Sequence, residues 1–160
     1  MRFLKRRTKP LLAPALIAAR WWADEMRGGY NRFNLGDESD TGGIVVAMAT
    51  LHYGRADEPK AGSIDAFELY LARALSDELY RLEAIRKKLD PKQRPNWHPV
   101  IFLHVDHGPE GMLLDALRAT KTTGLSMSIP TKSSMSITTS EVKVACGYQS
   151  DWVELPIPAP

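Results

Sequence analysis

Apolar residues recur every three to four positions in two stretches of the chain, which is the period of an amphipathic helix. The first stretch covers residues 11–27 and ends at a Gly28-Gly29 pair, with Pro14 in the first turn, where its missing N–H costs nothing. The second covers residues 64–89, and Ser63 precedes it as an N-cap. Its stripe comprises Ile64, Phe67, Leu71, Leu75, Leu79, Leu82, Ile85 and Leu89. The pattern therefore predicts two helices, of which the second is long.

The C-terminal half has the pattern of strands. Residues 100–105 form a dense β-type run, and residues 135–138 and 142–146 alternate with period two around a short turn. Between the first run and this hairpin, Gly108-Pro109-Glu110 predicts the start of another helix, with Pro109 in its first turn. The order β-α-β-β predicts a small mixed sheet with a β-α-β crossover, covered by the long helix. The fold class is α+β.

The secondary structure of three further segments can also be predicted. Residues 44–53 favour a short buried helix, and the three prolines of residues 90–99 indicate a stiff linker. The tail, residues 155–160, also has three prolines, so we do not expect it to extend the sheet.

Length and composition indicate one ordinary domain. The chain has 160 residues, 44% hydrophobic and 25% charged, which excludes general disorder. We expect a basic arm over residues 1–10 and one globular domain over residues 11–160. The single cysteine, Cys146, favours a reducing compartment and hence the cytoplasm, and its place on a strand favours a buried, unreactive thiol. No stretch has the roughly 20 apolar residues of a membrane span.

The charge is concentrated at the N-terminus. Residues 1–9 contain five basic side chains and no acid, whereas the rest of the chain has 16 basic and 19 acidic residues. The basic side chains are those of Arg2, Lys5, Arg6, Arg7 and Lys9. Such an arm suits a nucleic acid, an anionic membrane or an acidic protein, or it is a solvated terminus. The acidic body, and the lack of a second basic cluster, count against nucleic acid.

Two adjacent tryptophans follow the arm. Neighbouring positions on a helix point about 100° apart, so at most one of Trp21 and Trp22 can lie centrally on a core-facing stripe. We expect the other to be partly exposed. With Tyr30, Arg32 and Phe33 it then forms a surface that binds a partner. The alternative is that the tryptophans pack inside the protein.

Histidines and acids gather where the predicted strand 100–105 meets the next helix. His104, Asp106, His107 and Glu110 could hold a metal ion or orient a histidine as a general base. The alternative is that these side chains only cap the helix. They match the H-x-H-x-D-H run of the metallo-β-lactamase fold only in part, because Phe102 replaces its first histidine and no histidine follows His107. This partial match does not establish a resemblance.

No motif for nucleotide binding or nucleophilic catalysis is present. We therefore predict a non-enzymatic binding or regulatory protein that acts through protein–protein contacts and has no cofactor. A role as a phage or mobile-element accessory protein would suit this general character, although no motif in the sequence carries a resemblance to such proteins. One alternative is a small metal-dependent hydrolase that uses His104, Asp106 and His107. The other is a nucleic-acid-binding protein that uses the basic arm.

Overall fold

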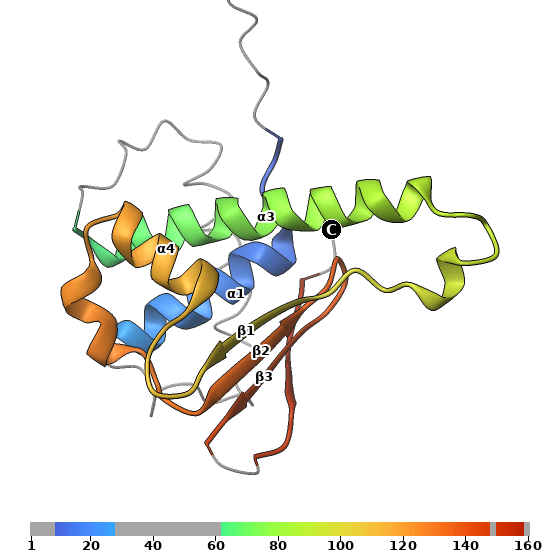
Figure 1. Cartoon of the computed structure of the whole chain (residues 1–160). Helices are drawn as coiled ribbons and strands as arrows, with labels where there is room; N and C mark the ends of the chain where they lie inside the picture. The colour runs from blue at the N-terminus through green and yellow to red at the C-terminus, as the bar shows by residue number, and fades with distance from the viewer. Residues whose placement is uncertain (1–8, 28–61, 148–149, 159–160) are drawn as a thin grey trace, which may run out of the picture.

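The computed structural model describes residues 9–27, 62–147 and 150–158 (Figure 1). Its helices are α1 (Ala13–Met26), α3 (Ile64–Lys88) and α4 (Gly111–Ala119), with short 3₁₀ helices at Arg94–Asn96 (η1) and Thr123–Ser128 (η2). Both helices predicted from the apolar period are confirmed, with Pro14 in the first turn of α1. The helix predicted at residues 44–53 lies outside the described residues. No described helix is both long enough and apolar enough to cross a membrane.

The long helix α3 begins at the predicted N-cap. Ser63 Oγ accepts a hydrogen bond from the Ala66 N–H at 3.0 Å. The apolar stripe is fully buried from Phe67 to Leu79, but it continues past the core, and Ile85 is exposed. In Figure 1 the C-terminal end of α3 accordingly extends beyond the sheet, and residues 89–99 return the chain to β1. The projecting end of α3 carries Arg86, which lines the pocket of the candidate site.

The sheet has four strands, β1 (Ile101–Val105), β2 (Ser133–Ile137), β3 (Val142–Cys146) and β4 (Val153–Leu155), in the order β1-β2-β3-β4. The α+β class and the β2–β3 hairpin are confirmed, but every pairing is antiparallel, so the predicted mixed sheet and its parallel crossover were wrong. The physical reason is that the connection from β1 to β2 returns to the end of the sheet that it left. There the backbone N–H of Lys132 donates to the carbonyl of Asp106, and their side chains form an ion pair.

Two boundaries also differ from the prediction. Helix α4 begins at Gly111, whereas Pro109 forms an isolated antiparallel bridge with Val105 instead of entering the first turn. The fourth strand was not predicted, and Leu155 pairs with Val142 although prolines follow it. Those prolines lie beyond β4, so they remove no hydrogen bond from its ladder.

Helix α1 lies between α3 and the sheet (Figure 1). It contacts α3 on one side and β2 and β3 on another, so it has more than one buried face. Its small residues, among them Ala15, Ala18 and Ala19, are completely buried. A helix of this composition, apolar nearly all round, is typical of the interior of a protein. The core is therefore built around α1.

Replacing Lys121 by glycine should stabilise the protein. Lys121 follows α4 with a φ of 59°, the left-handed conformation in which glycine usually ends a helix, and the N–H groups of Lys121 and Thr122 donate to Arg118 and Leu117. We expect Lys121→Gly to exceed Lys121→Ala in free energy of unfolding by about 1 kcal/mol, because only glycine adopts this φ without steric cost. Urea unfolding of the two variants measures the difference, and equal stability would contradict it.

Candidate functional site

The predicted histidine and acid cluster does not assemble into one site. His104 lies on the outer face of β1, and its Nδ1 is 2.7 Å from Ser134 Oγ on β2. Asp106 instead pairs with Lys132 and lies 3.3 Å from Nε2 of His107, whose side chain is exposed. Glu110 precedes α4, and its side chain forms no capping hydrogen bond. Within the described residues no group of three potential metal ligands occurs.

The expectation that one of the two tryptophans is partly exposed was wrong. Trp21 is 3% exposed and Trp22 is 0% exposed, and their rings meet edge to face with centroids 4.7 Å apart. Both are buried because α1 packs against α3 and against the sheet, so side chains 100° apart on the helix each meet a neighbouring element. The sequence signal for this was the run of apolar residues from Ala13 to Ala19, which the single charge of Arg20 ends only before the tryptophans. Neither tryptophan is available to a partner.

The remaining residues of the predicted partner surface lie outside the described residues. These are Arg2, Lys5, Arg6, Arg7, Tyr30, Arg32 and Phe33. Their part in binding stays a prediction that rests on the sequence.

A second basic cluster, which the sequence analysis overlooked, lies at the projecting end of α3. Residues 86–94 contain five basic side chains and one acid, Asp90. The basic residues are Arg86, Lys87, Lys88, Lys92 and Arg94, all of them exposed except the partly exposed Arg86. The cluster spans the boundary between α3, which ends at Lys88, and the linker that follows it, so neither element alone contains all five basic residues. We call these five residues the α3-end cluster.

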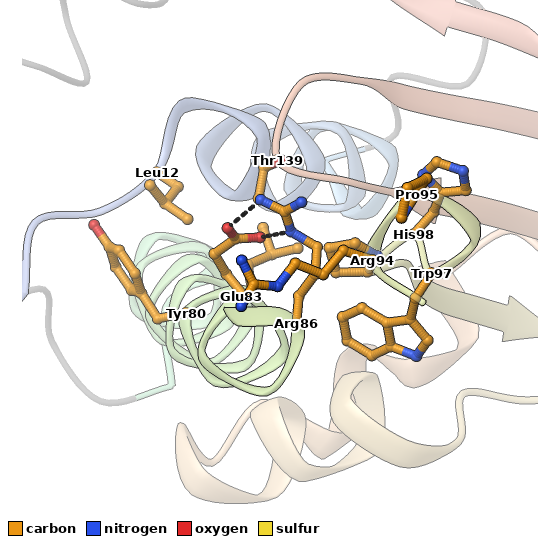
Figure 2. A pocket seen from close by; sticks show the side chains of 11 residues that line it. Leu12, Tyr80, Glu83, Arg86, Arg94, Pro95, Trp97, His98 and Thr139 are labelled. Carbon is orange, nitrogen blue, oxygen red and sulfur yellow. Dashed lines mark hydrogen bonds and ion pairs between the residues drawn. The ribbon is translucent and has the colours of Figure 1, made fainter. Parts of the chain in front are cut away.

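A pocket of about 530 Å³ lies beside this cluster (Figure 2). Tyr80 lies at one end of it, and Trp97 and His98 lie at the other, while Arg86 and Arg94 extend between them. The chain segments that form it are distant in sequence, since Leu12 and Thr139 also line it. A volume of this size is in the range of pockets that hold small molecules or single nucleotides.

The two arginines of the pocket are held in different ways. Arg86 forms two hydrogen bonds to Glu83, at 2.8 and 2.7 Å, and this guanidinium holds the pKa of Glu83 below its usual value. Arg94 donates to the backbone carbonyls of Leu89 and Lys87, at 3.0 and 2.8 Å, and so caps the C-terminus of α3. Carbonyl groups orient the Arg94 guanidinium without neutralising it. Its positive charge is therefore fixed beside the pocket.

The basic arm joins the body at the same place. Tyr80, which lines the pocket, donates a hydrogen bond from its hydroxyl to the carbonyl of Pro10 at 3.1 Å. The ammonium of Lys9 lies 4.7 Å from the centre of the Tyr80 ring, a cation–π contact. Lys9, the last basic residue of the predicted arm, and the α3-end cluster, 77 positions away at Arg86, thus lie at the same pocket. Outside residues 1–9 and 86–94 the chain has 11 basic and 18 acidic residues, a net charge of −7.

No protein-family model matches the chain, and no curated protein matches it in sequence.

Proposed function

We propose that this protein is a non-enzymatic binding protein that holds a single-stranded nucleic acid against the α3-end cluster. The observation that carries the proposal is that the α3-end cluster and Lys9 lie at one pocket lined by the aromatic rings of Tyr80 and Trp97. Phosphate groups attract clustered lysine and arginine, and unpaired bases stack on exposed aromatic rings. Proteins that bind single strands without reading their sequence combine these two features.

Trp97 distinguishes this partner from an acidic protein. Both partners would be attracted by the positive charge, but a single strand offers a base beside every phosphate, which suits a partly exposed indole beside Arg94 and His98. The protein–protein alternative was based in part on Trp21 and Trp22, and both of these are buried. The aromatic side chains available near the positive charge are those of Tyr80 and Trp97. This arrangement supports a nucleic acid more than a protein partner.

Binding should weaken steeply as salt rises. We expect the full chain to bind a fluorescein-labelled oligothymidine of about 20 nucleotides, a length that exceeds the site of one small domain. The affinity should fall by at least tenfold between roughly 50 and 200 mM NaCl, because each phosphate contact releases counterions.

Replacing Lys87, Lys88 and Lys92 together by alanine should lower the affinity at least tenfold at low salt. It should also reduce the slope of log affinity against log salt by about 2, at ~0.7 per lysine on a single strand. Fluorescence anisotropy measures all three quantities.

A matched variant controls for net charge. Arg73, Arg118 and Lys121 are exposed and belong to other parts of the surface, so their replacement by alanine removes the same number of charges. This variant should retain most of the affinity, whereas Trp97→Ala should lose about 5- to 150-fold with an unchanged salt slope, since stacking on a base contributes about 1–3 kcal/mol. A flat salt response, or an equal loss in both triple variants, would refute the proposal. Binding of duplex but not of single strands would refute the assignment to single strands.

A further inference from the structure

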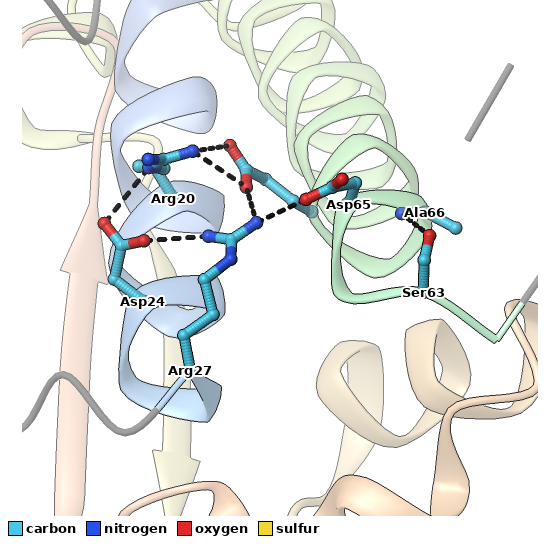
Figure 3. Close-up of polar contacts among 7 residues, drawn as sticks. Arg20, Asp24, Arg27, Ser63, Asp65 and Ala66 are labelled. Carbon is cyan, nitrogen blue, oxygen red and sulfur yellow. Dashed lines mark hydrogen bonds and ion pairs between the residues drawn. The ribbon is translucent and has the colours of Figure 1, made fainter. Parts of the chain in front are cut away.

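A carboxyl group is buried in the last turn of α1, and the described residues supply it with no ion-pair partner. Glu25 is 4% exposed, and its Oε2 has no hydrogen-bond partner among those residues. The other acids of this region are paired: Asp24, Asp65 and Glu68 all meet the guanidinium of Arg27 (Figure 3). Burial of a carboxylate without a compensating charge is costly, so such a group takes up a proton instead.

Two more buried polar groups near the end of α1 have few partners among the described residues. Trp22 lies three residues earlier, on the same side of α1, and its indole Nε1 has no acceptor there. Ser133 of β2 is completely buried, and its hydroxyl has only the thiol of Cys146, a weak hydrogen-bonding group, beside it. Ser133 is the register partner of Cys146 on β3, whose thiol is close enough to interact electrostatically with Glu25. The end of α1 therefore meets the sheet across a polar patch inside the core.

The groups that surround Glu25 favour its neutral form. Burial, and then the negative charge of Asp24, raise the pKa of Glu25 to about 7. From β3, Cys146 adds no positive charge, and burial raises the pKa of its thiol, which keeps it protonated. Lys143, also on β3, alternates to the other face of the sheet and pairs with Glu141.

The other elements packed on α1 supply no free cation to Glu25 in the described part of the chain. β2 and η2 contain no titratable side chain. From α3, the acids Asp65 and Glu68 face α1, and they are held by Arg20 and Arg27 of the α1 segment itself. Both arginines are thus already engaged with carboxylates.

We propose that Glu25 is a pH-sensitive latch: its neutral carboxyl lets the C-terminal end of α1 dock on β2 and β3, and its ionisation loosens that end. The proton goes to solvent, and the buried carboxylate then gains by moving into water. The docked state binds the proton more tightly than the open state, so docking weakens as pH rises from the ordinary carboxyl pKa of 4.5 to about 7, and is constant above that. Helix α1 directly follows the basic arm, so the latch links pH to the element that carries the arm.

Hydrogen exchange of the full chain tests the latch. After correction for intrinsic exchange, the opening constant of the amides of residues 20–26 should increase roughly 70-fold between pH 5 and pH 8, and level off above it, which follows from the two pKa values. Glu25→Gln keeps the shape without the titration, so its opening constant should be independent of pH. Amides of α4, which does not contain the latch, should respond less than those of α1.

A second measurement needs no variant. The carboxyl carbon of Glu25, followed by NMR in the wild-type chain, should titrate with a midpoint near neutral pH. A midpoint near the ordinary value, a Glu25→Gln chain that keeps the pH dependence, or the same pH response in α1 and α4 would each overturn the proposal.

Discussion

Truncating Phe67 to alanine should cost about 3–5 kcal/mol of the free energy of unfolding, the usual loss for a large aromatic residue in a packed core. Phe67 is 0% exposed and lies on the face of α3 that packs into the core. Its removal takes the ring out of an apolar environment and leaves a cavity that the surrounding helices fill only in part. The total free energy of unfolding of a domain is about 5–15 kcal/mol, so this substitution would remove a large part of it.

Tyr70 provides the matched control for this prediction. It lies one turn further along α3, has a ring of similar size and is 42% exposed. Tyr70→Ala should cost less than about 1 kcal/mol, because little apolar area is lost from the interior. Urea unfolding followed by circular dichroism compares the two variants. Equal losses would mean that the core does not include the buried stripe of α3.

Replacing Glu68 by glutamine should cost about 2 kcal/mol, in the range for losing hydrogen bonds between charged groups that are partly buried. The side chain of Glu68 is 10% exposed, and its Oε2 lies 3.0 Å from Nη2 of Arg27 and 3.4 Å from Nη1 of Arg20 (Figure 3). The substitution keeps the shape of the side chain and removes its charge. Arg20 and Arg27 would then lose the carboxylate of α3 that they share, and Asp65 would remain as the partner of Arg27 alone.

The exposed pair of Glu78 and Arg81 is the control for this network. These side chains lie on the outside of α3 with an N–O distance of 2.5 Å, and Arg81 is largely exposed. Glu78→Gln should cost less than about 1 kcal/mol, since solvent screens such pairs and their side chains lose entropy when held together. A double-mutant cycle of Glu68→Gln with Arg27→Met should give a coupling above about 1 kcal/mol. A coupling near zero would show that the network does not hold the two helices together.

Local patterns in the sequence determined the helices and the hairpin. Period, N-cap and breaker residues act within a few positions, so Ser63 and the apolar stripe of α3 could be located without any tertiary information. The turn between β2 and β3 was predicted in the same way. The start of α4 was not, because the bridge from Pro109 to Val105 shifts it to Gly111, and a pairing of this kind is not visible in the local pattern.

The candidate site was only partly readable from the sequence. The charge of residues 1–9 and of residues 86–94 is a property of composition, although the second cluster was overlooked across a helix boundary. That Lys9 lies on Tyr80, beside the pocket that Arg86 and Arg94 also line, depends on the fold, since contacts between distant segments follow from packing and not from spacing. The histidine cluster shows the opposite case: His104 and Asp106 are close in sequence, but they take different partners.

The sequence by itself thus determined where the chain is helical or extended and where its basic charge lies, because propensity, periodicity and charge are local. Within the described residues, the tertiary structure alone decided that every strand pair is antiparallel, that Trp21 and Trp22 are both buried and that Glu25 has no counter-charge. Each of these depends on which elements enclose α1 and on where the long connection from β1 returns. Those relations arise from burying several apolar faces at once, and no single segment encodes them.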